Sequence, residues 1–157
     1  MICAFLLLYL NEEEAFHCLC TICEKVVPGY YQENLWGIKL DQQVMDVFLR
    51  RYLPEVAAHI QTHIGGALLV CFEWFMCFFG RCLSLDLATC VFDWVLLDGP
   101  RALFVISLAI LKYLEDDILQ LTSGTELIDK VKHTLLESIT HDNILPVRNA
   151  LYVTLFI

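Results

Sequence analysis

The chain has 157 residues, a length that suits one domain with its own hydrophobic core. It has 10 lysines and arginines against 19 acidic residues, and this net charge of −9 argues against binding to the phosphates of nucleic acid. Its hydrophobic fraction of 58% is high for a soluble protein, so the composition predicts either a membrane protein or the buried part of something larger.

Residues 1–10 are apolar and imitate the hydrophobic part of a secretion signal. No basic segment precedes them, and glutamates at 12–14 stand where a cleavage site would have small residues. We therefore interpret 1–10 as a core helix. No N-cap precedes Ile2, so the chain is expected to start inside a helix, as a truncated or partial domain would. The eight cysteines fall within helical patterns and are expected to be reduced and buried.

The stretch from Ile64 to Gly80 is apolar apart from Glu73 and is a candidate membrane span. The stretch is shorter than the roughly 20 residues that a span needs, Glu73 would lie in the middle of the bilayer, and Gly65-Gly66 would break one end. A small helical membrane protein, with spans at 64–80 and 102–114, stays open as an alternative.

The first third of the chain contains several helix boundaries. Asn11 is a candidate N-cap for a helix that should run to Pro28-Gly29, with carboxylates in its first turn where the helix dipole favours them. An aromatic-rich loop is expected from Tyr30 to Lys39. Asp41 is the next predicted N-cap, and Pro54 should begin another helix at a position where its missing N–H costs little.

The two helices that follow Asp41 and Pro54 should each bury an apolar stripe. In the first helix the predicted stripe is Val44, Val47, Phe48 and Tyr52. In the second it is Leu53, Val56, Ala57, Ile60 and Ile64.

The stretch from Glu73 to Gly99 predicts the hub of the fold. It contains two apolar runs with a polar break between them, which predicts buried helices over 67–79 and from Ser84 to Leu97. After the turn Asp98-Gly99-Pro100, residues 102–114 are apolar nearly all round. A helix with no polar face must be enclosed by others.

The end of the chain is less regular. Acidic residues at 115–117 mark the exit from the preceding helix, and Ser123 with Glu126 has the spacing of a capping box that opens a final helix. The predicted buried face of that helix is Leu127, Val131, Leu135 and Ile139. Beyond Thr140 the pattern decays, and the apolar, β-prone segment 152–157 should either pack on the core or promote association.

No strand-like alternation is sustained anywhere in the chain. The sequence therefore predicts an all-α fold of about seven helices with no sheet.

Two clusters resemble metal sites. His17, Cys18, Cys20 and Cys23 are of ligand type, but on a helix they point in different directions, and ordinary core thiols are favoured. Glu55, His59 and His63 are spaced four apart and would share one helix face. A solvated polar face explains that row without a metal, and we predict no metal-binding residues.

Asp93 is a lone carboxylate within the apolar run Val91 to Val95, so it should be paired or hydrogen-bonded if it is buried. A structural partner is favoured over a catalytic role. The chain has no Gly-rich phosphate loop, no Gly-x-Ser-x-Gly and no His-Glu-x-x-His. We therefore predict no catalytic residue and no cofactor.

The hub also resembles a known family. The residues that carry the resemblance, in order and spacing, are Trp74, Phe75, Phe79, Leu83, Leu85, Asp93, Leu97, Gly99, Ala109, Ile110 and Leu111. Further matches are Met1–Leu10 with Glu12–Phe16, Pro28–Tyr31, Leu40–Gln42 and Tyr52–Glu55. Together they resemble the C-terminal part of a TBC domain, the helical GTPase-activating domain that acts on Rab GTPases, over residues 1–140. Residues 141–157 are a divergent apolar tail.

The resemblance implies a mechanism whose key residues are missing. TBC domains supply an Arg from an Ile-x-x-Asp-x-x-Arg motif and a Gln from a Tyr-x-Gln motif. The first motif is absent from the chain, and Tyr30-Tyr31-Gln32 matches the second by coincidence in a later loop. This resemblance places Met1 just after the Gln finger and implies that Asp93, which here follows Phe92 instead of the family's Trp, holds helices together.

The implied partners are a Rab-type small GTPase and the N-terminal half of the TBC domain. The chain is expected to be cytoplasmic, to meet endomembranes at most peripherally, and not to bind nucleic acid. A non-catalytic helical module that binds a Rab or another protein is a further alternative.

Overall fold

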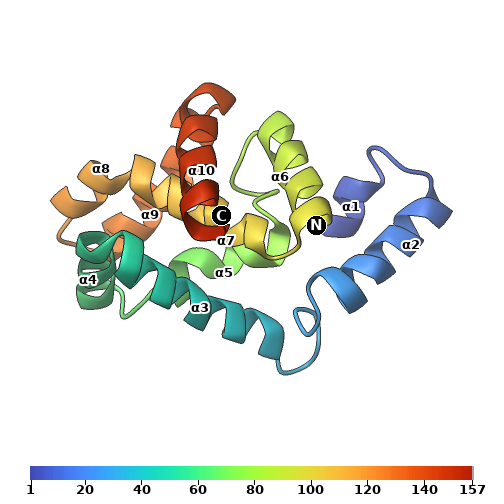
Figure 1. The fold of residues 1–157 in the computed structure, drawn as a ribbon, viewed down its shortest axis with the longest axis horizontal. Coiled ribbons are helices and arrows are strands. Elements are labelled where there is room, and N and C mark those ends of the chain that lie inside the picture. Colours follow the sequence, from blue (N-terminus) through green and yellow to red (C-terminus); the bar gives the residue numbers. More distant parts are fainter. Residues whose placement is uncertain (157) are drawn as a thin grey trace.

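The computed structural model describes the backbone of residues 1–156 and the side chains of all of these except 68, 133–137 and 156. This part of the chain forms ten α-helices and one π-helical segment and contains no strand (Figure 1). The helices are α1 (Ile2–Leu6), α2 (Glu12–Thr21), the π-helix η1 (Ile22–Val26), α3 (Trp36–Tyr52), α4 (Pro54–His63), α5 (Leu68–Cys77), α6 (Leu85–Asp98), α7 (Arg101–Tyr113), α8 (Glu115–Gln120), α9 (Gly124–Ser138) and α10 (His141–Phe156). The predicted all-α class is confirmed, whereas the predicted number of helices was too low.

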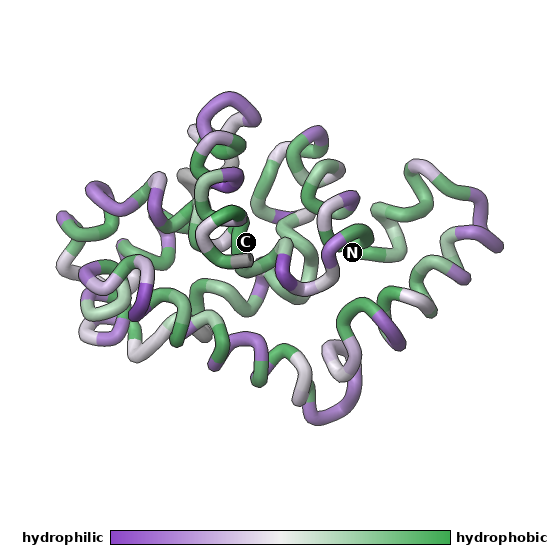
Figure 2. Tube along the Cα trace, in the orientation of Figure 1, coloured by the Kyte–Doolittle hydropathy of each residue, from purple (hydrophilic) through white to green (hydrophobic). Residues whose placement is uncertain are grey.

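Helix α7 forms the centre of the core. Every residue from Ala102 to Leu111 is buried, and α7 packs against α3, α5, α6, α8 and α10. The hydropathy of the chain follows this arrangement, since the first turn of α2 and the loop near 32–34 are hydrophilic while the central helices are hydrophobic (Figure 2). The prediction that an all-apolar helix must be enclosed is confirmed.

The hub helices form, but α5 ends two residues before the expected boundary. Phe78 and Phe79 adopt the left-handed conformation, with φ of 46° and 59°, which is unfavourable for bulky residues. Burial of both rings offsets this cost. Phe79 lies 5.2 Å from the Trp74 ring and Phe78 lies 5.3 Å from the Phe92 ring, centroid to centroid. Phe92 in turn stacks on Phe5 of α1 at 3.8 Å.

Several predicted boundaries are confirmed. The Asn11 side chain accepts a hydrogen bond from the backbone N–H of Glu14 at 3.0 Å, and the Glu14 carboxylate accepts one from the Asn11 N–H at 3.3 Å. Pro54 occupies the first turn of α4, and the Ser123 hydroxyl accepts a bond from the Glu126 N–H at 3.5 Å. Ser84 precedes α6 as predicted, although its side chain makes no capping hydrogen bond.

The predicted start of α3 at Asp41 is wrong, because α3 begins at Trp36 inside the expected loop. Tertiary contacts cause the early start. The Gly37 N–H donates to the Gly29 carbonyl at 3.3 Å, and the Trp36 indole N–H donates to the Gln32 side chain at 2.7 Å. Asp41 lies within the helix, where its carboxylate accepts a 2.5 Å hydrogen bond from the Tyr30 hydroxyl.

The apolar stripe predicted for α3 is confirmed in part, since Val44, Phe48 and Tyr52 are partly buried against the core. The buried residues are Gly37, Ile38, Gln42, Met45 and Leu49, whereas the Val47 side chain is 59% exposed. The stripe of α4 is confirmed, with Leu53, Val56 and Ile60 buried and Ala57 and Ile64 partly buried. The core helix expected at 1–10 is reduced to α1, after which Leu7, Leu8 and Tyr9 are exposed.

The end of the chain contains two helices that were not predicted. The acidic segment expected as an exit forms α8, whose first turn places three carboxylates at the positive end of the helix dipole. Residues expected to form a divergent tail form α10, which packs along α7 through buried Ile144 and partly buried Val147, Leu151 and Leu155. The β-prone segment is thus helical to residue 156, and residue 157 lies outside the described part.

Arg148 attaches α10 to α6. Its guanidinium carbon lies 4.6 Å from the Trp94 ring centroid and 4.9 Å from that of Tyr152, and an Nη atom lies 3.8 Å from an Asp98 carboxylate oxygen. A cation between two aromatic faces with a nearby carboxylate fixes the orientation of α10.

Replacing Asp41 with asparagine should flatten the dependence of stability on pH. Burial raises the pKa of Asp41 above its usual value, while the Tyr30 hydrogen bond acts in the opposite direction. The contribution of this group to stability is therefore fully present below the pKa of the unfolded chain and is lost as pH rises through the higher folded-state pKa. Asparagine accepts the same hydrogen bond without ionising. Thermal unfolding is followed by circular dichroism between about pH 4 and 7. The midpoint of unfolding should fall less with rising pH in Asp41→Asn than in the parent.

The control for this prediction is Asp129→Asn, which alters an exposed carboxylate on α9. It should leave the slope of the pH profile unchanged. A profile that is equally steep in Asp41→Asn and in the parent would contradict the prediction.

Candidate docking groove

The structure does not assemble the two metal-like clusters into a site. In the described part of the chain, no group of three or more His, Cys, Asp or Glu side chains is placed to hold a metal ion. His17 is exposed, and Cys18, Cys20 and Cys23 are half-buried. The expectation that the cysteines are buried holds only for Cys71 and Cys82, since Cys3 is exposed and the others are half-buried.

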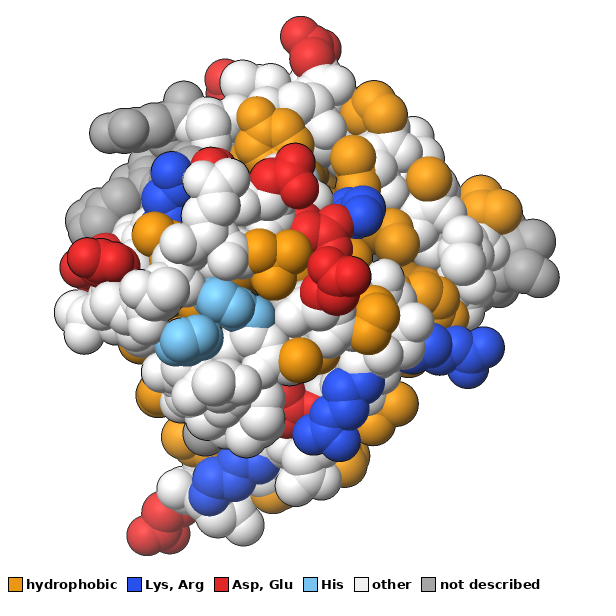
Figure 3. All heavy atoms as spheres, turned by 90° about the vertical axis from the view of Figure 1, so that its left-hand side faces the viewer, with side chains coloured by type: hydrophobic (Ala, Val, Ile, Leu, Met, Phe, Trp, Pro, Cys, Tyr) orange, Lys and Arg blue, Asp and Glu red, His pale blue; other side chains and the backbone are white. Residues whose placement is uncertain are grey.

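The histidine row on α4 has a structural role. The rings of His59 and His63 lie 4.4 Å apart, and His59 Nε2 is 2.6 Å from the carbonyl oxygen of Leu121. The imidazole N–H therefore donates to that carbonyl and holds α4 against the segment after α8. Glu55 is exposed on the same helix. On the surface formed by α4, α8 and α9, acidic, basic and apolar side chains are intermixed (Figure 3).

Asp93 was expected to need a charged or hydrogen-bonding partner if it were buried. It is exposed on α6, so it does not require one. The membrane-span alternative also lacks a suitable helix. Within residues 1–156 no helix has the length and apolar character needed to cross a bilayer, and α5 and α7 have 10 and 13 residues.

A groove of about 890 Å³ opens between α3, the Gly65-Gly66 turn, α5 and α9. Its apolar floor comes from one face of α5, through Leu69, Phe72 and Met76. The sequence patterns did not predict this groove. The available signal was that the 67–79 run is apolar apart from Glu73, so more than one face of the helix had to be covered.

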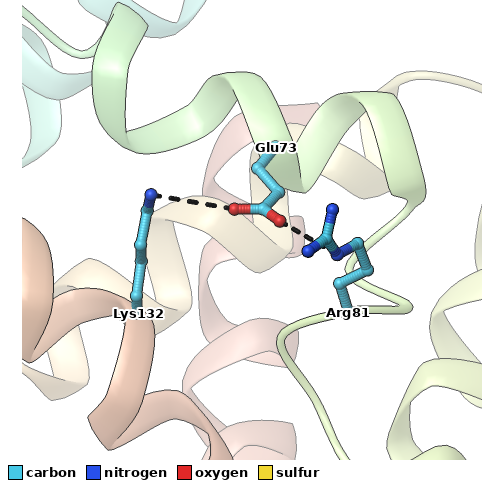
Figure 4. Close-up of polar contacts among 3 residues, drawn as sticks. All are labelled: Glu73, Arg81 and Lys132. Carbon is cyan, nitrogen blue, oxygen red and sulfur yellow. Dashed lines mark ion pairs between the residues drawn. The ribbon is translucent and has the colours of Figure 1, made fainter.

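An ion cluster closes one side of the groove. The Glu73 carboxylate on α5 lies 3.2 Å from Arg81 Nε, and its other oxygen lies 3.9 Å from Lys132 Nζ on α9 (Figure 4). The side chains are 29%, 58% and 46% exposed respectively, so each pair contributes at most about 1 kcal/mol to stability. The cluster places one carboxylate between two cations at this side of the groove.

The second carboxylate of the groove is also engaged. Asp46 on α3 accepts a hydrogen bond from the backbone N–H of Ala67 at 3.1 Å, which holds the Gly65-Gly66 turn in place. Gly66 has a φ of 132°, a conformation that favours glycine. Lys39 on the same helix is exposed at the groove.

The thiols near the groove are poor nucleophiles. Burial raises the pKa of Cys77 and raises the pKa of Cys82 to about 11. The thiolate is the reactive form, so both groups are largely unreactive at neutral pH. Cys90, which lies 3.5 Å from His141 Nε2, also has a pKa raised by burial. Covalent catalysis by these thiols is therefore disfavoured.

The motif-like Gln32 has a partner inside the fold. Its side-chain oxygen accepts the hydrogen bond from the Trp36 indole, and the neighbouring Tyr31 hydroxyl donates to the carbonyl of Met76 at 3.0 Å. Both side chains thereby stabilise the loop between η1 and α3.

Comparison with known proteins gives the family. The model of the Rab-GTPase-TBC domain matches residues 1–119. The chain belongs to the TBC domain family. Mouse Carabin is 37% identical over 128 residues, which cover 82% of this chain and 29% of Carabin. Human TBC1 domain family member 2A is 39% identical over 126 residues, which cover 79% of this chain and 14% of that protein.

The TBC fold agrees with a solved structure, the Chlamydomonas flagellar RabGAP TBC domain. The TM-score is 0.82 at 25% sequence identity, and the match covers 94% of this chain and 49% of that chain. The structural match therefore extends beyond the residues that the family model covers. The chain spans about half of the solved TBC chain and less than a third of the two curated relatives.

Proposed function

We propose that this chain forms the C-terminal part of a TBC unit that stimulates GTP hydrolysis by a Rab-type GTPase, and that the chain alone does not stimulate it. The observation that carries the proposal is the TBC match over residues 1–119 in a sequence with no Ile-x-x-Asp-x-x-Arg. Its Tyr-x-Gln letters fall in a loop where Gln32 is already hydrogen-bonded. Both fingers would have to come from residues outside these 157.

In such a unit, the Arg finger offsets charge that develops on the transferred phosphoryl group, and the Gln orients the attacking water. The part played by this chain is to support and position the half of the unit that carries the two fingers. The side chain of Met1 lies beside Gly80, next to Arg81 at the edge of the groove. The working location is then the cytoplasm, with contact to endomembranes through the GTPase.

Single-turnover GTP hydrolysis by purified Rab-type GTPases tests the proposal. The 157-residue chain should leave the intrinsic rate unchanged, while a TBC domain that carries both finger motifs should accelerate it by orders of magnitude in the same assay. Acceleration by the chain alone would refute the proposal that both fingers lie elsewhere.

A non-catalytic binding module is the second candidate, and the groove favours it. Under this alternative the chain would bind a GTP-loaded Rab, measured by biolayer interferometry, without any change in hydrolysis rate.

A further inference from the structure

The groove floor is an apolar face of α5 that the described core does not cover. Leu69 and Phe72 are 55% and 39% exposed, and Met76 is half-buried. These residues are spaced three and four apart, so they lie along one face of the helix over about 10 Å. The opposite face, through Val70, Cys71, Trp74 and Phe75, is buried in the core. Helix α5 therefore presents apolar side chains on two sides.

The charges around this floor are unequal. Three cations, Lys39, Arg81 and Lys132, face two carboxylates, Asp46 and Glu73. Glu73 is paired with both Arg81 and Lys132, and Asp46 accepts a backbone hydrogen bond, while no ion pair of Lys39 occurs among the described residues. The charged side chains of the groove therefore sum to +1, whereas the whole chain has a net charge of −9. Complementarity calls for an acidic occupant.

We propose that this groove binds a short acidic, amphipathic helical segment of another protein. Two turns of such a helix match the length of the floor and would place apolar side chains against Leu69, Phe72 and Met76. Its carboxylates would then lie near Lys39 at one wall and near the exposed Arg81 and Lys132 at the other. Three dispersed cations are too few for a nucleic acid backbone. The proposal does not depend on GTPase activation.

Fluorescence anisotropy with a designed peptide tests this site. The probe is a fluorescein-labelled helical peptide of about 16 residues, long enough to be partly helical in water. It has leucines at i, i+3 and i+7 and glutamates at the flanking positions. A second peptide has lysine at every glutamate. The acidic peptide should bind the 157-residue chain, and the lysine peptide should bind at least about tenfold more weakly.

Variants of the chain locate the binding. Phe72→Ala and Lys39→Glu should each lower the affinity for the acidic peptide by about tenfold. The first substitution removes part of the apolar floor, and the second reverses the charge at one wall of the groove. The matched control is Leu97→Ala, which removes an 81% exposed leucine from α6, away from the groove residues. It should leave the affinity unchanged. Circular dichroism melting of each variant checks that the fold is retained.

Three results would overturn the proposal. The first is equal binding of the two peptides, and the second is affinity that is unaffected by both groove variants. The third is a monomer–dimer equilibrium, measured by sedimentation, that Phe72→Ala abolishes, which would assign the groove to a second copy. The probe contains no GTPase, so none of these results bears on the hydrolysis assay.

Discussion

Gly37→Ala is expected to destabilise the chain by about 3 kcal/mol or more. A Cβ atom at position 37 would lie 2.2 Å from the carbonyl oxygen of Pro28 and 3.0 Å from the carbonyl carbon of Gly29. Both contacts are with backbone, so no side chain can rotate away. The substitution would separate the start of α3 from the turn that precedes it and strain the hydrogen bond from the Gly37 N–H. Urea unfolding followed by circular dichroism measures the change.

Gly80→Ala is the control for this prediction. A Cβ there would approach the carbonyl oxygen of Cys77 at 3.1 Å and other groups only at 3.7 Å or more, so the loss should be about 1 kcal/mol or less. Equal stabilities for the two variants would show that α3 does not need the close approach to Pro28.

Phe75→Ala is expected to lower the free energy of unfolding by about 3 to 5 kcal/mol, because it opens a cavity at the centre of the core. The Phe75 ring is fully buried on α5 and lies 5.6 Å from the Phe104 ring of α7, centroid to centroid. For a chain of this size the midpoint of thermal unfolding should fall by on the order of 10 °C. Differential scanning calorimetry would record the shift.

The matched control removes the same atoms from the surface. Phe16 on α2 is 63% exposed, so Phe16→Ala should change the midpoint by no more than about 1 to 2 °C. A small loss in Phe75→Ala would mean that the core around α5 is loosely packed.

The features that sequence predicted well have local causes. The cap at Asn11 needs only Asn11 and Glu14, and the first turn of α4 needs only Pro54. The enclosure of α7 follows from the absence of a polar face between Ala102 and Leu111. Each signal lies within a few residues of its effect, so no knowledge of the rest of the fold is required.

The features that were missed depend on contacts that reach outside the helix in which they occur. Helix α3 begins early because Trp36 and Gly37 pack on the turn at Gly29, and its buried face includes Gln42, which no apolar stripe would select. Helix α10 contains Pro146 and lacks a clear apolar period, so packing against α7, and not local preference, makes it helical.

The groove could not be predicted for the same reason. Lys39, Glu73, Arg81 and Lys132 come from separate elements, and the Glu73–Lys132 pair joins helices that are far apart in sequence. Sequence patterns could not show which apolar face of α5 would remain uncovered.

The ring contacts of Phe92 connect the start of the chain to the groove. Phe92 stacks on Phe5 of α1 and touches Phe78, which lies in the turn between α5 and Arg81. Close-packed rings transmit displacement and do not absorb it. These ring contacts therefore tie the packing of α1 to the turn that precedes Arg81 at the edge of the groove.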